Sequence, residues 1–198
     1  MAGAGRRDAH AEATRALIIR QARTVFAARG FADAGLAEIV AAARVTTGAV
    51  YHHFGDKKGL FLAVAEAVEA DILTGLGQAA ATHSDPWEQL MAGVEAMLEI
   101  CARPDVQRIV FRDAPTVIGP AAWREIELRY GFGVMRSALE ALIARKIIRQ
   151  GSADVLASIM LGALIEAAGA IARAEDQAGT ALEARETVRR LFAALRSP

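Results

Sequence analysis

The sequence predicts an all-α protein, and three observations lead to this fold class. Apolar residues recur at helical spacing along almost the whole chain, and no segment shows the sustained alternation that a half-buried strand needs. Residues that begin and end helices divide this pattern into segments of helical length. The chain has 198 residues, of which 54% are hydrophobic, so it can form one or two domains with a core of ordinary size.

The first part of the chain is predicted to form four helices. Ile18, Val25 and Phe26 lie on one face of the first helix, and Gly30 ends it in the manner of a C-terminal glycine. Residues 1–12 are expected to form a flexible arm. The four predicted helices are Thr14–Arg29, Leu36–Ala43, one that begins at Thr46 or Thr47, and one from Asp56 to about Leu76.

Five further helices are predicted in the rest of the chain. Asp85, Pro86 and Glu88 combine an N-cap acid, a proline at the first helical position and an acid at the third, which is a strong helix start. Thr180 and Glu183 form another capping-box pattern. The predicted helices are Pro86–Arg103, Pro104–Phe111, Pro120–Lys146, Ser152–Ala174 and Thr180–Leu195.

Charge and cysteine content limit the environment of the protein. Residues 1–60 hold nine Lys or Arg against five Asp or Glu, whereas the remainder holds fourteen against eighteen, so a polyanion would bind at the N-terminal end. The apolar runs are interrupted before they reach the roughly 20 residues of a membrane span, and the N-terminus lacks the apolar core of a secretory signal. A single cysteine, Cys101, allows no intrachain disulfide. We therefore expect a cytoplasmic protein with no membrane partner.

The stretch VTTGAVYHHFGDKKGLF, residues 45–61, is the part of the sequence that most clearly indicates a function. Two short helices joined by a tight turn make a helix-turn-helix candidate, in which the first residues of the second helix enter the DNA major groove. Thr46 is a plausible N-cap, while Thr47 and Gly48 are small enough to approach base edges. Val50 and Phe54, four residues apart, would hold this helix to its core.

The paired histidines of this stretch suggest two other interpretations. A metal site is not expected, because His52 and His53 point about 100° apart on a helix and no carboxylate or cysteine lies at ligand spacing. No other cofactor is expected either. A helical enzyme that uses His52 and His53 with an acid such as Asp56 is a remote alternative, since no nucleophile accompanies them.

The segment RTVFAARGFADAGLAEIVAAARVTTGAVYHHFGDKKGLF, residues 23–61, closely resembles the DNA-binding domain of TetR family transcriptional regulators. The matching residues are Phe26, Gly30, Phe31, Ile39, Ala42, Ala43, Val45, Gly48, Tyr51, His53, Phe54, Lys57 and Leu60. The resemblance implies a homodimeric repressor that binds a palindromic operator and releases it when a small molecule enters a C-terminal helical domain. It also implies a division into the arm, a DNA-binding domain over residues 13–60, and a regulatory and dimerisation domain over residues 61–198.

The residues expected to contact DNA follow from the helix-turn-helix and from this resemblance. Thr47, Gly48 and Tyr51 occupy positions that approach bases in the family, and Tyr51, His53 and Lys57 occupy positions that commonly meet phosphates. The full set expected at the operator is Arg44, Thr46, Thr47, Gly48, Tyr51, His52, His53 and Lys57.

Three residues depart from the family pattern. Gly35 stands where Thr or Ser usually caps the second helix, so it offers no hydroxyl. Arg44 replaces a glycine of the turn, which would cost about 1 kcal/mol or more if the turn needs positive φ, but would add a charge beside DNA. Lys58 stands where an acid is frequent.

The C-terminal part is expected to bind a small apolar or amphipathic effector. The stretch RIVFRDAPTVIGPAAWREIELRYGFG resembles the ligand domains of one subgroup of the family. Bulky, adaptable side chains and one acid are candidates for the pocket, although the bulky ones equally suit an ordinary core. The candidates are Met91, Met97, Phe111, Trp123, Phe132, Met135 and Glu166. Glu166 is alternatively an intersubunit partner or a solvated surface residue.

The last two predicted helices carry apolar stripes that could dock on a second copy as a four-helix interface. The residues expected there are Leu161, Ile165, Gly169, Val188, Leu191, Phe192 and Leu195. The sequence thus predicts a one-component repressor. An activator, or a partner-controlled DNA-binding adaptor without a small ligand, is the alternative.

Overall fold

The all-α prediction is confirmed by the computed structural model, which describes residues 2–196 and the side chains of residues 9–196. Within the described residues, the only extended pairing is a single bridge between Ile148 and Arg196. The elements, in order, are α1 (Ala2–Asp33), α2 (Leu36–Ala43), α3 (Thr47–Phe54), α4 (Lys57–Ala80), α5 (Pro86–Cys101), α6 (Pro104–Val106), η1 (Gln107–Asp113), α7 (Ala114–Ile118), α8 (Pro120–Ala144), α9 (Ala153–Arg173) and α10 (Gln177–Ala193).

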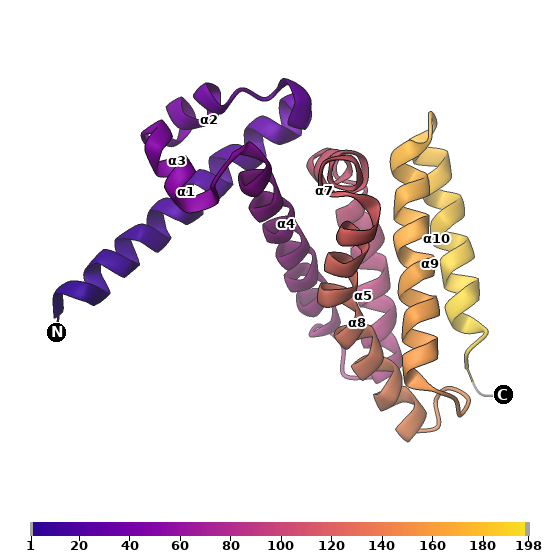
Figure 1. Cartoon of the computed structure of the whole chain (residues 1–198). Coiled ribbons are helices and arrows are strands. Elements are labelled where there is room, and N and C mark those ends of the chain that lie inside the picture. Colours follow the sequence, from indigo (N-terminus) through magenta and orange to yellow (C-terminus); the bar gives the residue numbers. More distant parts are fainter. Residues whose placement is uncertain (1, 197–198) are drawn as a thin grey trace.

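The helices gather into two groups (Figure 1). Helices α1, α2 and α3 cluster at one end, and α4 leads from this cluster to a bundle formed by α5, α8, α9 and α10. Buried side chains continue from Ile18 and Phe26 in α1, through Phe61 and Val68 in α4, into the bundle. Because α4 contributes to the cores of both groups, a displacement of α4 would affect both.

The predicted starts of α4, α5 and α9 are confirmed by side-chain caps. Asp85 accepts hydrogen bonds from the backbone N–H groups of Trp87 and Glu88, at 2.9 and 3.0 Å. Asp56 accepts from Gly59 N at 2.6 Å, and Ser152 accepts from Val155 N at 3.4 Å. These side chains satisfy N–H groups that the first turn of a helix leaves free.

Several predicted boundaries differ from the structure, most of all in α1, α10 and the segment after Pro104. Helix α10 begins at Gln177, because Asp176 caps it by accepting from Gly179 N, so Thr180 lies inside the helix. Helix α1 begins at Ala2, within the segment predicted to be a flexible arm, and residue 1 lies outside the described residues. The segment predicted as one helix from Pro104 to Phe111 divides into α6 and the π-helical η1, which passes directly into α7.

Helix α9 is long and apolar enough to cross a membrane by length and composition, with a mean hydropathy of 2.0 over its best window. The expectation that every apolar run is interrupted too early is therefore wrong for this helix. However, eight of its residues are buried in the protein, and it packs against α8, α10 and α5. A core helix of this kind passes the same test as a membrane span, so the test is weak evidence for a membrane.

Candidate DNA-binding surface and ligand cavity

The turn between α2 and α3 adopts the backbone conformation in which a residue other than glycine is strained. Arg44 has φ 53° and ψ 42°, in the left-handed region that favours glycine. Its backbone N–H donates to Ala41 O and that of Val45 donates to Val40 O, both at 3.2 Å, which closes the end of α2. Gly35 begins α2 in an extended conformation and without a side-chain cap. The turn is thus well formed with Arg44 in it, and α2 begins without the hydroxyl cap that is usual in the family.

Helix α3 presents its polar residues outward and its apolar residues inward. Thr46 accepts a hydrogen bond from Ala49 N at 3.2 Å, as an N-cap does. Thr47, Gly48 and His52 are exposed, and Tyr51 is 53% exposed, which is unusual for a large aromatic side chain. Val50 is fully buried. This face therefore leaves the predicted base-contacting groups free to meet DNA.

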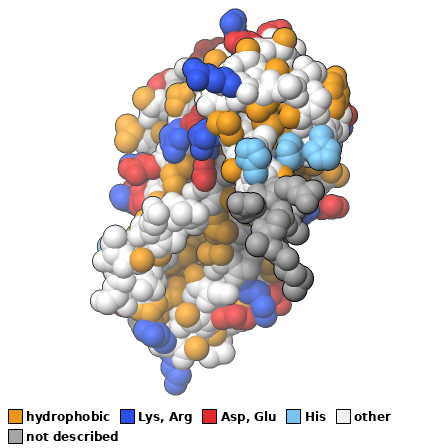
Figure 2. All heavy atoms as spheres, turned by 90° about the vertical axis from the view of Figure 1, so that its left-hand side faces the viewer, with side chains coloured by type: hydrophobic (Ala, Val, Ile, Leu, Met, Phe, Trp, Pro, Cys, Tyr) orange, Lys and Arg blue, Asp and Glu red, His pale blue; other side chains and the backbone are white. Residues whose placement is uncertain are grey.

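The exposed face includes several histidine side chains. Figure 2 looks from the side of the helix-turn-helix and shows histidines gathered close together on this face. The rings of His52 and His53 lie 5.2 Å apart. Within the described residues, no group of three or more His, Cys, Asp or Glu side chains is arranged to hold a metal ion.

Lys57 has contacts with the end of α1 that sequence reasoning missed. Its Nζ donates to Ala32 O at 3.3 Å and lies 4.6 Å from the centre of the Phe31 ring. The ammonium group therefore holds the end of α1 to the start of α4. A phosphate bound by Lys57 would have to share the ammonium group with these contacts.

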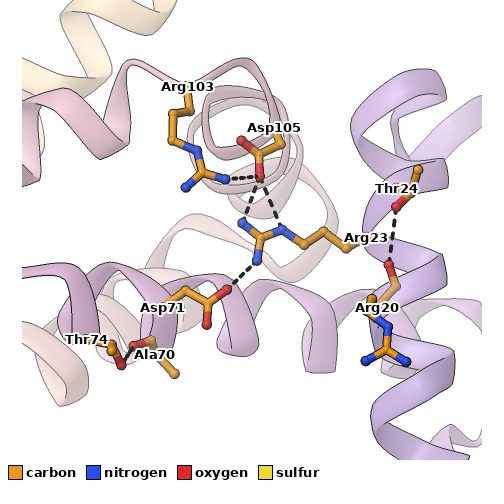
Figure 3. A network of polar contacts seen from close by, with 8 residues as sticks. All are labelled: Arg20, Arg23, Thr24, Ala70, Asp71, Thr74, Arg103 and Asp105. Atoms are coloured by element: carbon orange, nitrogen blue, oxygen red, sulfur yellow. Dashed lines mark hydrogen bonds and ion pairs between the residues drawn. The ribbon is translucent and has the colours of Figure 1, made fainter.

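The group of helices α1, α2 and α3 is joined to the bundle by a cluster of ion pairs around Arg23 (Figure 3). The Arg23 guanidinium, from α1, donates to Asp105 Oδ2 at 2.7 and 3.2 Å and also to Asp71 of α4. Arg103 donates to the same Asp105 oxygen at 3.2 Å. Burial alone would raise the pKa of Asp105, but the hydrogen bonds and charges of Arg23 and Arg103 outweigh it and lower that pKa below its usual value. Asp105 is thus ionised at neutral pH and links α1 to α6.

A second connection runs through η1 to the place where α1 is interrupted. At Gly30, φ is 78° and ψ is 168°, so the helical hydrogen-bond pattern breaks there. Arg108 of η1 donates to Arg29 O at 2.9 Å, and Asp113 of η1 accepts from Phe31 N at 2.7 Å. The positive φ favours glycine here, and a Cβ at this position would displace the Arg108 guanidinium. The π-helical turn therefore supplies the partners that the interrupted helix lacks.

A cavity of about 450 Å³ lies inside the bundle, within the size range of small-molecule sites. Helices α4, α5, α8 and α9 line it together with η1. Three predicted residues, Met97, Phe111 and Met135, lie on its wall. Val110 and Phe111 belong to η1, so η1 contacts both this cavity and the interrupted end of α1.

The other four candidates for the pocket do not line this cavity. Trp123 is buried in the core, and Met91 and Phe132 are half-buried against it. Glu166 points to solvent with 75% of its side chain exposed, and it pairs with Arg173. Helical spacing identifies an apolar face, but it does not separate residues that fill the core from residues that border an open space.

Sequence reasoning missed the two acids on the cavity wall. Burial and, to a smaller extent, the nearby charge of Glu127 together raise the pKa of Glu69 to about 8. Burial also raises the pKa of Glu127, although Arg124 opposes this effect. In the sequence, Glu66 and Glu69 look like ordinary exposed acids on a helix. The only signal is that Glu69 lies one position after Val68 and three before Ile72, beside the apolar face of α4.

The outer face of α9 and α10 differs from the predicted dimer stripe. Leu161, Val188 and Phe192 lie in the core of their own protomer, so this part of the predicted stripe is wrong. Gly169 is also buried, Ile165 and Leu195 are half-buried, and Leu191 is exposed. The large apolar side chains that are most exposed on these two helices are Val155, Ile159 and Leu182. The predicted pattern had the correct period, but apart from Leu191 it selected residues that are buried or half-buried in the protomer.

Comparisons with known proteins agree with this geometry. Residues 18–64 match the model of bacterial regulatory proteins of the tetR family, and residues 87–195 match the tetracyclin repressor-like C-terminal domain. A TetR-family transcriptional regulator from Pectobacterium atrosepticum, known from its crystal structure, is 36% identical, with a TM-score of 0.87; the match covers 96% of this chain and 97% of that one.

Two curated regulators are similar over shorter segments. The transcriptional repressor BepR of Brucella suis is 36% identical over 109 residues, which are 54% of this chain and 51% of BepR. The transcriptional activator FasR of Mycolicibacterium smegmatis is 35% identical over 85 residues, which are 43% of this chain and 39% of FasR. These matches thus span about half or less of the relatives' own length.

Proposed function

This chain belongs to the TetR family of transcriptional regulators, and we propose from this premise that it is a repressor released from its operator by a small molecule. The family consists of DNA-binding regulators that are not enzymes, so catalysis by His52 and His53 has no support. The observation that carries the proposal is the position of η1. One part of η1 lines the cavity, and another part holds the interrupted end of α1.

The proposed release mechanism follows from these contacts. A ligand that fills the cavity would press on Val110 and Phe111, and the short η1 would transmit the displacement to Arg108 and Asp113. These residues bind the backbone on both sides of Gly30, immediately before α2. The two recognition helices of a dimer would then no longer fit two successive major grooves.

The exposed side of α9 and α10 is the proposed dimer surface. Val155, Ile159 and Leu182 are more than half exposed in the protomer, and burying them would favour association. A second copy docked there would form a four-helix interface. The protein would act in the cytoplasm, where its operator lies.

Selection of bound DNA from a random pool, followed by footprinting, tests the proposal. Two-fold symmetry predicts a palindromic site whose half-sites lie roughly 34 to 36 Å apart, or farther apart if two dimers share one operator. A single asymmetric half-site bound with full affinity would contradict this arrangement.

The similarity to FasR keeps an activator as the alternative. A reporter gene controlled by the selected operator distinguishes the two functions. Its expression should rise when the regulator gene is deleted if the protein is a repressor, and fall if it is an activator. If the protein is instead a partner-controlled adaptor, no small molecule that enters the cavity should change its affinity for DNA.

A further inference from the structure

The cavity wall combines apolar side chains with acidic ones. Glu69 comes from α4 and Glu127 from α8, and Glu69 feels the charge of Glu127. None of the described residues that line the cavity is Lys, Arg or His. The two carboxyl groups therefore face an apolar space that contains no protein cation.

The two carboxyl groups differ in their partners. Glu127 Oε2 lies 3.5 Å from Arg124 Nη1, and its side chain is 11% exposed. Among the described residues, no hydrogen bond or ion pair reaches Glu69, although burial penalises its charged form. Glu69 is half-buried, and an acid that is shielded from water without a partner is costly when ionised. With a pKa of about 8, Glu69 is mostly protonated in the empty cavity at neutral pH.

We propose that the cavity binds apolar molecules that carry a single positive charge, such as a quaternary amine, with Glu69 and Glu127 together holding that charge. The proposal rests on the function proposed above, in which this cavity is the effector site. The rings of Phe111 and Tyr130 line the same space and can offer their faces to the cation. An anionic ligand would instead meet two acids and no basic side chain.

Binding of a cation should be coupled to loss of a proton from Glu69. The titratable groups that face Glu69 are Glu127 and Tyr130 of α8 and Cys101 of α5. The thiol, with a pKa of about 12, and the tyrosine, with its pKa raised, stay uncharged near neutral pH. Because the ligand favours the ionised form of Glu69, affinity should rise with pH up to about 8, where the free carboxyl ionises by itself, and then level off.

Three probes that share a benzyl group test the proposal on the full chain. They are benzyltrimethylammonium, its uncharged carbon isostere neopentylbenzene, and the anion benzylsulfonate. None of them titrates between pH 6 and pH 9, so any pH dependence belongs to the protein. Equilibrium dialysis should show that the cation binds roughly tenfold or more tightly at pH 8 than at pH 6. The affinity of neopentylbenzene should not change with pH, and the sulfonate should not bind.

Variants assign the effect to the two acids. Glu69→Gln should abolish the pH dependence and weaken binding of the ammonium probe at pH 8 about tenfold or more, while it leaves neopentylbenzene unaffected. Glu127→Gln should also weaken binding of the ammonium probe. Glu66→Gln is the matched control, because Glu66 lies on the same helix, pairs with Arg129 and is not among the residues lining the cavity. Unchanged melting temperatures or operator binding would show that each variant folds.

Results that differ from these expected affinities would overturn the inference. Equal binding of the ammonium probe and its uncharged isostere at pH 8, preference for the sulfonate, or no binding of the ammonium probe would each exclude a cation site. The function proposed above fails separately, through absence of specific DNA binding or of any ligand that releases DNA. Release from the operator by an uncharged or anionic molecule would support the proposed repressor function and would contradict the proposed cation site.

Discussion

At the scale of single residues, Lys57 and Thr47 are predicted to have different roles on DNA. Lys57 holds the ends of α1 and α4 together through Ala32 O and the Phe31 ring. Thr47 is exposed at the first turn of α3. The lysine thus combines a structural contact with an expected phosphate contact, whereas the threonine is free to meet a base.

Substitution of these residues should have different effects on DNA binding. Lys57→Ala should weaken binding to all sequences and reduce the slope of log K against log salt by about 0.9 for each phosphate that is no longer neutralised, hence by roughly two units per dimer. Thr47→Ala should leave the slope unchanged and cost on the order of 1 to 3 kcal/mol per half-site at one base position. Salt titrations with matched and mismatched operators measure both effects.

Controls for this pair must separate folding from binding. The neighbouring Lys58 is exposed, so Lys58→Ala reports the effect of removing a charge without the contacts of Lys57. Each variant should first be shown to melt and dimerise like the unmodified protein. If Thr47→Ala changed the salt slope and Lys57→Ala changed base preference, the assigned roles would be wrong.

Glu69 should make the stability of the empty protein depend on pH. Its pKa is raised from 4.5 to about 8 on folding, so the folded protein binds more protons than the unfolded chain between these values. The free energy of unfolding should therefore fall as pH rises through this window and level off above pH 8. Glu69→Gln should remove this component, on the order of 1 to 3 kcal/mol between pH 5 and pH 8. Urea unfolding at several pH values measures it, and equal pH profiles for the two proteins would contradict the burial of this carboxyl.

At the scale of elements, the π-helical η1 joins the cavity to the DNA-binding domain. It is seven residues long and supplies both Phe111, on the cavity wall, and the Arg108 and Asp113 side chains that bind α1. Gly30 is the residue of α1 that makes this contact possible, because its positive φ exposes the backbone groups to which Arg108 and Asp113 bind.

Replacement of Gly30 by alanine should therefore destabilise the protein. Positive φ and the clash with Arg108 should together cost on the order of 1 to 3 kcal/mol. Gly133→Ala is the matched control, because Gly133 lies inside α8 with open space around its missing Cβ, and should stabilise by up to about 1 kcal/mol. Thermal and urea unfolding of both variants give the comparison. A Gly30→Ala protein as stable as the unmodified one would show that η1 does not hold α1 tightly.

At the scale of the whole molecule, the proposed dimer surface lies far from the helix-turn-helix. Figure 1 shows α9 and α10 at the opposite side of the molecule from α1. A dimer formed through these helices would leave both DNA-binding domains free. The distance between the two recognition helices would then depend on α4 and on the contacts of η1.

Charge placed on the exposed side of α9 and α10 should give monomers. Ile159→Glu together with Leu182→Glu should prevent association and abolish operator binding while leaving the helical content unchanged, because both side chains are exposed in the protomer. Phe192→Glu is the contrasting variant and should unfold the protomer, since that ring is fully buried. Analytical ultracentrifugation and circular dichroism distinguish these results. A double variant that stays dimeric would place the interface elsewhere.

The sequence by itself determined most of the helices, several of their caps and the helix-turn-helix, because these depend on interactions between residues close together in the chain. Thr46 and Asp85 cap their helices as predicted, and Val50 anchors α3. Only the tertiary structure decided which candidate residues line the cavity, that Glu69 and Glu127 face each other, and which side of α9 and α10 is exposed. These features depend on how distant helices rotate against one another, and helical periodicity gives the apolar face of a helix without naming the partner that it packs against.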